Sequence, residues 1–213
     1  MTELPERLAE VRERIEAARR RSGRSGGEVG IVAVTKEFDV ATVQAALDAG
    51  LQCIGENRAQ DLLDKAERVS GPEWHFLGQI QRNKIARLAP VVAVWHSVDR
   101  LVVAEAIAHR APGARVYLQV NVGDEPQKGG CPPGSVPELA STFQALGLSV
   151  EGLMTVPPRA ADPRPHFVAL RELALDAGLE GLSMGMSDDY EVAVEEGATV
   201  VRLGSALFGP RPR

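Results

Sequence analysis

The chain has only two cysteines among its 213 residues, and it has no long apolar run. Cys53 falls in a β-rich segment and Cys131 in a Pro/Gly-rich one, a pattern typical neither of a disulfide framework nor of a metal site, so both are expected to be free thiols. No stretch approaches the roughly 20 apolar residues that span a bilayer, and the first residues lack a signal-peptide pattern. We therefore expect a cytoplasmic protein without a membrane partner.

The sequence also lacks an excess of basic residues. It has 24 Lys and Arg against 29 Asp and Glu, a formal net charge of −5. Nucleic-acid binding depends on a basic field that neutralises phosphates, so no nucleic-acid partner is expected. The hydrophobic fraction of 44% is ordinary for a globular protein. Because no low-complexity tract or long linker interrupts the chain, residues 1–213 are expected to form one domain.

Helical and β-rich segments alternate along the chain. A helical pattern at 4–21 is followed by eight β-rich runs near 31–35, 51–55, 74–78, 91–97, 115–122, 148–154, 180–184 and 198–204. Helical segments are expected at 39–49, 57–69, 81–89, 99–110, 135–146, 163–177 and 188–196. Eight strand-helix steps favour an α/β fold, a single closed (β/α)8 barrel of the TIM type with an extra N-terminal helix. An open doubly wound sheet is the alternative.

Lys36 stands at the carboxyl end of the first predicted strand, directly after the apolar run 31–35. Barrel active sites lie at this end of the strands, and a desolvated lysine has its pKa lowered toward the range in which the amine is nucleophilic. Taken alone, Lys36 is more simply a loop residue that points to water. A phosphate site elsewhere at the same mouth would instead favour a Schiff-base lysine for a phosphorylated aldehyde.

Two segments near the end of the chain have the features of such a phosphate site. Residues 185–189 follow the seventh strand, and a helix opening at Ser187 would present backbone N–H groups and a hydroxyl to the mouth. After the eighth strand, Gly204 would allow close backbone approach and Ser205 would add donors. These two loops are the usual phosphate site of the barrel. An ordinary strand-to-helix turn is the alternative for each.

Further polar residues are expected around the mouth. Arg202, in an otherwise apolar strand, needs a partner if it points inward, and a pyridine nitrogen would serve. Asn57 follows the second strand and is equally well interpreted as a helix cap. For His75 and His96 we favour core or rim positions over metal ligands, because neither shows a second ligand at metal spacing. No metal site is expected.

Seven short motifs in this order resemble the pyridoxal phosphate homeostasis protein family, and the match runs from about residue 8 to the end. They are residues 33–36 (AVTK), 55–57 (GEN), 74–84 (WHFLGQIQRNK), 96–100 (HSVDR), 119–121 (QVN), 152–154 (GLM) and 182–187 (LSMGMS). The resemblance implies a barrel similar to the N-terminal domain of alanine racemase, with pyridoxal 5′-phosphate bound to Lys36 as an aldimine. It also implies that Ser187, Gly204 and Ser205 hold the phosphate, Arg202 faces the pyridine nitrogen, and Asn57 and Met184 line the ring.

The chain departs from the family pattern at a few positions. Arg58 stands where an aromatic residue is common, which argues against a stacking role there, and Thr35 replaces a common serine. Lys128 matches a second family lysine suggested to interact with the cofactor. A solvated loop lysine is the preferred interpretation of Lys128.

We expect a pyridoxal phosphate carrier for vitamin B6 homeostasis rather than an enzyme. Racemisation needs an acid or base on each face of the substrate carbon, and after the eighth strand only residues 206–213 remain to supply an opposing tyrosine. We correspondingly expect an open mouth, a monomeric protein, and pyridoxal phosphate-dependent apo-enzymes as recipients of the cofactor. The alternatives are an amino-acid racemase or other aldimine enzyme, and a class I aldolase-like enzyme, which also uses a barrel lysine and this phosphate site.

Overall fold

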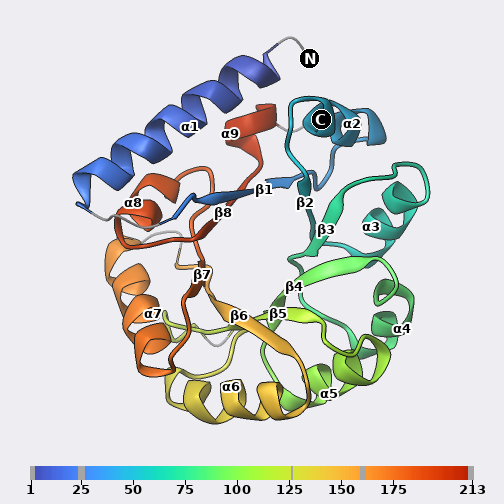
Figure 1. Cartoon of the computed structure of the whole chain (residues 1–213), viewed down its shortest axis with the longest axis vertical. Helices are drawn as coiled ribbons and strands as arrows, with labels where there is room; N and C mark the ends of the chain where they lie inside the picture. The colour runs from blue at the N-terminus through green and yellow to red at the C-terminus, as the bar shows by residue number, and fades with distance from the viewer. Residues whose placement is uncertain (1–2, 24–26, 126, 159–161, 211–213) are drawn as a thin grey trace.

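Eight parallel strands pair in chain order, and β8 pairs with β1 to close a barrel. The computed structural model describes residues 3–23, 27–125, 127–158 and 162–210. Residues 24–26 and 126, which fall between predicted strands and helices, lie outside the described residues. The closed ring confirms the predicted (β/α)8 barrel and excludes the open sheet. Figure 1 shows the strands enclosed by a ring of helices.

The strand bounds lie within about two residues of most predicted runs. The strands are β1 (Gly30–Val34), β2 (Cys53–Glu56), β3 (Glu73–Phe76), β4 (Val92–Val98), β5 (Arg115–Gln119), β6 (Ser149–Met154), β7 (Gly181–Ser183) and β8 (Val200–Leu203). The α-helices are α1 (Leu4–Arg21), α2 (Val40–Asp48), α3 (Ala59–Ala66), α4 (Ile85–Leu88), α5 (Leu101–Arg110), α6 (Val136–Ala145), α7 (Arg164–Asp176), α8 (Tyr190–Glu195) and α9 (Ser205–Phe208).

Three helical features differ from the sequence predictions. The segment predicted as one helix at 81–89 is a 3₁₀ turn, η1 (Arg82–Lys84), followed by the single turn α4, and a second 3₁₀ turn, η2 (Pro133–Ser135), precedes α6. The short helix α9, after β8, was not predicted. One helical turn is too short to show the 3.6-residue periodicity on which the prediction relied.

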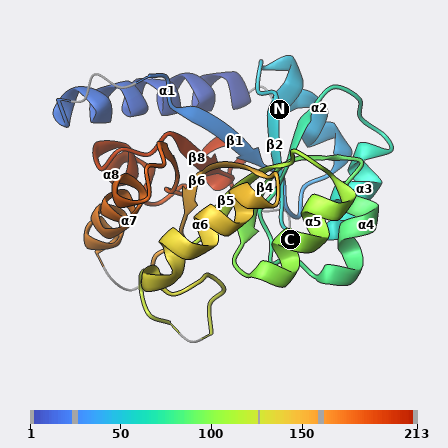
Figure 2. The same ribbon diagram turned by 60° about the horizontal axis from the view of Figure 1, so that its bottom comes forward.

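Helix α1 lies outside the ring, beside α8 and α9 (Figure 1), and Figure 2 also places it next to α8. Its apolar residues recur at helical spacing, and Leu8, Val11 and Ile15 are buried. Three arginines in its last turn complement the negative end of the helix dipole. No helix in the described ranges is long and apolar enough to cross a bilayer.

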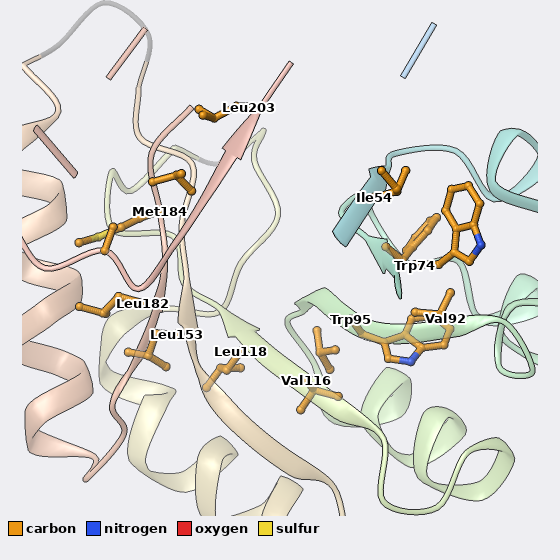
Figure 3. Close-up of a cluster of buried hydrophobic side chains, with 14 of the residues drawn as sticks. Ile54, Trp74, Val92, Trp95, Val116, Leu118, Leu153, Leu182, Met184 and Leu203 are labelled. Carbon is orange, nitrogen blue, oxygen red and sulfur yellow. The ribbon is translucent and has the colours of Figure 1, made fainter. Parts of the chain in front are cut away.

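Alternation along the strands divides the core into two parts. The larger cluster joins outward-facing strand residues to the helices, and Figure 3 labels such residues on β2 to β8, among them Trp74, Trp95 and Leu153. A smaller cluster of Val94, Tyr117 and Met154 is separate from it. The interior of the barrel also carries polar groups, and these lead to its mouth.

Candidate functional site

A cavity of about 580 Å³ opens at the carboxyl ends of the strands, within the usual size range of small-molecule pockets. The end residues Val34 of β1 and Met154 of β6, with Arg202 of β8, place it at the mouth. Its lining residues are Val34, Lys36, Phe38, Asn57, Leu77, Met154, Val156, Pro157, Pro158, Pro163, Met186, Ser187, Asp188, Asp189, Arg202, Gly204 and Ser205.

Lys36 lines this cavity, two residues beyond the end of β1. Val34 lines it as well, because residues two apart along an extended chain share a face. Lys36 is half-buried. The side chain therefore reaches the pocket that also contains Ser187, Gly204 and Ser205, as the proposed Schiff-base role requires.

A buried ion pair fixes the chain just before Lys36. Thr35 Oγ1 donates to Glu56 Oε1 at 2.6 Å, and Lys65 Nζ donates to the Thr35 carbonyl at 2.7 Å and to Glu56 Oε1. Burial raises the pKa of Glu56, while the hydrogen bonds from Lys65 and Thr35 oppose this shift. Lys65 was not predicted from the sequence, because it lies on the covering helix α3 rather than in a motif.

The two predicted phosphate segments meet in space. Ser187 Oγ accepts from the backbone N–H of Gly204 at 3.3 Å and of Ala206 at 3.1 Å. Ser187 was expected to open the next helix, but α8 begins at Tyr190 with Asp189 as its N-cap residue. The Ser187 hydroxyl is engaged across the mouth instead. Ser187 and the Gly204–Ser205 segment thus meet at one side of the cavity.

The turn after β7 depends on a glycine. Gly185 has φ +93°, and an added Cβ would lie 2.6 Å from Ala193 Cβ, so a side chain would be strained there. Beyond it, Asp189 Oδ1 accepts from the Met186 N–H at 2.6 Å. Burial raises the pKa of Asp189, which lines the pocket.

Arg202 points into the barrel and is 5% exposed. Nη1 donates to the carbonyl and hydroxyl oxygens of Ser183 at 2.6 and 2.8 Å, and Nη2 donates to the Thr155 carbonyl at 2.8 Å. Burial lowers the pKa of Arg202 to about 10, so the guanidinium remains charged at neutral pH. Three acceptors leave part of its five-donor capacity for the pocket that it lines.

Asn57 also lines the cavity. Its interpretation as a helix cap is wrong, because the N-cap position of α3 is Arg58 and carries no side-chain cap bond. The backbone of Asn57 packs against Gly78, where an added Cβ would lie 1.8 Å from the Asn57 carbonyl oxygen. The position of Asn57 therefore depends on a glycine at 78.

Met184 does not line the cavity. It is fully buried in the larger cluster between strands and helices (Figure 3). The neighbouring Ser183 bonds to Arg202 inside the barrel, and alternation turns the next residue the other way. Met154 and Met186 line the pocket in its place.

Lys128 is held close to the mouth, and its side chain is 27% exposed. Its Nζ donates to the Pro157 carbonyl at 2.9 Å and pairs with Glu125 at 2.5 Å. Pro157 lines the cavity, but Lys128 is not among the lining residues. It is thus a partly exposed loop lysine that backbone carbonyls anchor beside the cavity.

Hydrogen bonds continue from Arg202 down the barrel interior. Ser183 Oγ lies 2.8 Å from His96 Nδ1, and His96 Nε2 lies 2.8 Å from His75 Nδ1. Burial lowers the pKa of His75 to about 4 and that of His96 well below its ordinary value. Both rings are therefore neutral at neutral pH, in the core positions that sequence analysis favoured.

Several lining residues were not anticipated from the sequence. Phe38 and Val156 lie in no motif that the sequence singles out, and Met186 lies in the predicted phosphate segment but was given no role. Met154 could have been found, because it ends a resembling motif and the sixth predicted strand. Asp188 and Asp189 lie in the predicted phosphate segment but were given no role.

A scan of known families matches residues 7–212 to "Alanine racemase, N-terminal domain". The chain is 45% identical over 223 residues to the pyridoxal phosphate homeostasis protein of Pseudomonas aeruginosa, covering 99% of this chain and 97% of that protein. It is 41% identical to the protein of the same name from Aquifex aeolicus, covering 97% of each. The PipY structure of Synechococcus elongatus with pyridoxal phosphate bound has a TM-score of 0.83 and 30% identity, covering 97% of this chain and all of that one.

Proposed function

Since the chain belongs to the pyridoxal phosphate homeostasis family, on the alanine racemase N-terminal barrel, we propose that it binds pyridoxal 5′-phosphate in the mouth cavity and contributes to intracellular vitamin B6 homeostasis. The observation that carries the proposal is the meeting of Lys36, Arg202 and the Ser187/Ser205 segments in one cavity. A relative that covers nearly the whole chain was solved with this cofactor.

The donor set fits the groups of the cofactor. The bound cofactor would supply an aldehyde that condenses reversibly with a primary amine, and Lys36 is the lysine among the described lining residues. Ser187 and Ser205, with the backbone at Gly204, would hold the phosphate, because hydroxyl and N–H donors suit an anion. A cavity of about 580 Å³ has room for such a ligand.

Arg202 and Asn57 are the proposed partners of the ring. A guanidinium cannot act as an acceptor, so Arg202 facing the pyridine nitrogen would keep that nitrogen unprotonated. An unprotonated ring is a weaker electron sink, and that restrains catalysis on amino acids. Three protein acceptors hold Arg202 in place for this role.

We propose a carrier rather than a catalyst. The relatives are named for homeostasis, and the lining residues that the structure describes include no tyrosine or histidine to oppose Lys36. Pyridoxal phosphate-dependent apo-enzymes are the proposed recipients. Large apolar side chains are exposed at only four of the described positions, which supports a monomer. Sedimentation at several concentrations would test the oligomeric state.

Absorbance and covalent trapping test the binding proposal. Wild-type protein incubated with pyridoxal phosphate and reduced with borohydride should carry the pyridoxyl group on the peptide that contains Lys36. Lys36→Ala should lose both the visible chromophore and the trapped peptide while keeping its circular dichroism. Lys128→Ala, a matched change at the same mouth, should keep both. A label on another lysine in the wild type would refute the assignment of Lys36.

Isotope exchange separates a carrier from a racemase. The loaded protein is mixed with each L-amino acid in deuterated water, and deuterium at Cα is followed by NMR. The carrier proposal expects exchange no faster than with free pyridoxal phosphate. Rapid exchange that is lost in Lys36→Ala would establish an enzyme instead.

A further inference from the structure

The amino-terminal floor of the barrel holds a second group of reactive side chains. Cys53 and Glu73, the first residues of β2 and β3, are paired across the two strands, and His75 follows on β3 with the same orientation as Glu73. One ligand atom from each residue lies within 4.8 Å of the others. The mouth cavity lies at the opposite ends of the strands, so this group is distinct from it.

One ring nitrogen of His75 is aimed into this group. The His75 side chain is 6% exposed, and Glu73 Oε1 lies 3.4 Å from its Nε2. Nε2 is buried and has no hydrogen-bond partner in the described part of the chain. Buried polar atoms are nearly always hydrogen-bonded, so an unsatisfied one needs an explanation.

We propose that Cys53, Glu73 and His75 form a binding site for a transition-metal ion of the zinc class. Thiolate, carboxylate and imidazole are the ligand types that zinc takes in proteins, and three protein ligands leave a further position for water. A zinc ion about 2.0–2.3 Å from each ligand atom would require the present arrangement to contract slightly. Cys53 and Glu73 are only half-buried, which leaves the ion a route from solvent.

Arg115 is the cation that competes for this site. Its Nη1 lies 2.8 Å from Glu73 Oε1, and its Nε lies 3.4 Å from Glu151 Oε1. Because Arg115 already reaches a second carboxylate and is 47% exposed, it can release Glu73 to a metal ion. Its charge should nevertheless weaken cation binding.

The other ring nitrogen of His75 has the support that a metal ligand needs. Metal-bound histidines almost always donate their second N–H to a nearby acceptor, which fixes the ring. With a metal ion on Nε2, His75 would carry its proton on Nδ1 and donate to His96 Nε2, 2.8 Å away. His96 is itself fixed by Ser183. The floor is thus connected to Arg202 at the mouth through consecutive hydrogen bonds.

Metal titration of the full chain tests the site. Zn²⁺ should bind in a one-to-one complex by calorimetry, and Co²⁺ should give a thiolate-to-cobalt charge-transfer band. Cys53→Ser should abolish the band and weaken Zn²⁺ binding by at least roughly tenfold, since even a lost second-shell partner costs about 10- to 100-fold. Cys131→Ser is the matched control, because Cys131 is the other cysteine and lies beyond β5. It should leave both signals unchanged.

Two measurements keep the test independent of folding defects. In the wild type, Zn²⁺ should slow alkylation of Cys53, followed by peptide mass mapping, without any substitution. Arg115→Gln should tighten Zn²⁺ binding, because it removes the competing cation. Absence of Zn²⁺ binding by the wild type, a cobalt band that survives Cys53→Ser, or weaker binding by Arg115→Gln would each overturn the proposal.

Discussion

Two buried basic side chains at and beneath the mouth contact groups from other elements of the fold. Arg202 of β8 is held by Ser183 and Thr155, and Lys65 of α3 by Thr35 and Glu56. Lys65 and Glu56 form a buried ion pair, and removing either charge would leave the other one buried and uncompensated. The hydrogen bonds of Arg202 to buried oxygen atoms likewise restrict its position. Arg202 and Thr35, the neighbour of Lys36, are thereby held in place by protein groups.

Ser205→Ala tests the proposed phosphate contact. A hydrogen bond to a charged group contributes about 1.5 kcal/mol or more, so the variant should bind pyridoxal phosphate roughly tenfold more weakly. Fluorescence titration of the apo-protein measures this. Ser149→Ala, on an exposed residue that starts β6, is the control and should bind normally. Equal affinity of the two variants for pyridoxal phosphate would show that Ser205 does not contact the phosphate.

At the scale of elements, close approaches of strands and their following turns set the shape of the mouth. The segment after β3 comes close to the segment after β2 at Gly78, where an added Cβ would meet backbone rather than a movable side chain. Because backbone cannot easily give way, a larger residue must displace one of the two turns. Asn57 is on the turn that would move.

Gly78→Ala should therefore lower both stability and cofactor binding. We expect a loss of about 1–3 kcal/mol in the free energy of unfolding, measured by urea denaturation. Weaker pyridoxal phosphate binding should accompany it through the displaced Asn57. Gly134→Ala, where an added Cβ meets nothing within 4 Å, should change neither quantity. A fully stable Gly78→Ala protein would contradict the close approach.

Helix α8 is joined to its neighbours by ion pairs. Arg14 and Arg21 of α1 pair with Glu191, Arg21 also with Glu195, and Arg164 of α7 with Glu195. Most of these side chains are partly exposed, and each such pair alone contributes little. The hydrogen bonds from Arg164 and then Arg21 lower the pKa of Glu195.

This shift predicts a pH dependence of stability. A carboxyl with a lowered pKa in the folded state stabilises the protein above its unfolded pKa of about 4.3, and this contribution is lost as pH falls through the folded pKa. Glu195→Gln should thus be less stable than wild type near neutral pH and approach it below about pH 4. Urea denaturation at a series of pH values measures this. Glu13→Gln, on an exposed position of α1, should parallel wild type throughout.

At the scale of the whole molecule, the barrel closes where its first and last strands meet. Four residue pairs join β1 to β8, and α1 covers the outside through α8 and α9. Lys36 and Ser205 follow these two strands, so closure itself brings the proposed amine and phosphate contacts together. Packing of α1 against α8 and α9 should consequently stabilise the folded barrel and, with it, the arrangement of the mouth.

Ile15→Ala tests the contribution of α1. Ile15 is 4% exposed, and truncation of a buried isoleucine typically costs about 2–5 kcal/mol. Denaturant unfolding should show this loss in a single transition. Arg12→Ala, on the exposed side of α1, should change stability by less than about 0.5 kcal/mol. Similar stabilities for the two variants would mean that α1 is dispensable to the barrel.

The strand-helix rhythm, the place of Lys36 just beyond β1 and the position of the two loops proposed to hold the phosphate could be predicted, because each depends on residues that are close in sequence. Alternation and helical periodicity are local signals. The elements that they did not predict are short turns, among them α9. Met184 was assigned wrongly because its orientation depends on how β7 ends. Its neighbour Ser183 faces inward to Arg202, which the motif alone does not reveal.

By itself the sequence determined the barrel, the order of its elements and the place of Lys36 just beyond β1. Local periodicity locates each strand and helix, and the number of strand-helix steps specifies the barrel. The tertiary structure decided which side chains meet: Lys65 with Glu56, Ser187 with Gly204, and Cys53 with Glu73 and His75. The residues brought together come from different strands and helices, and only strand register and closure of the ring set their distances.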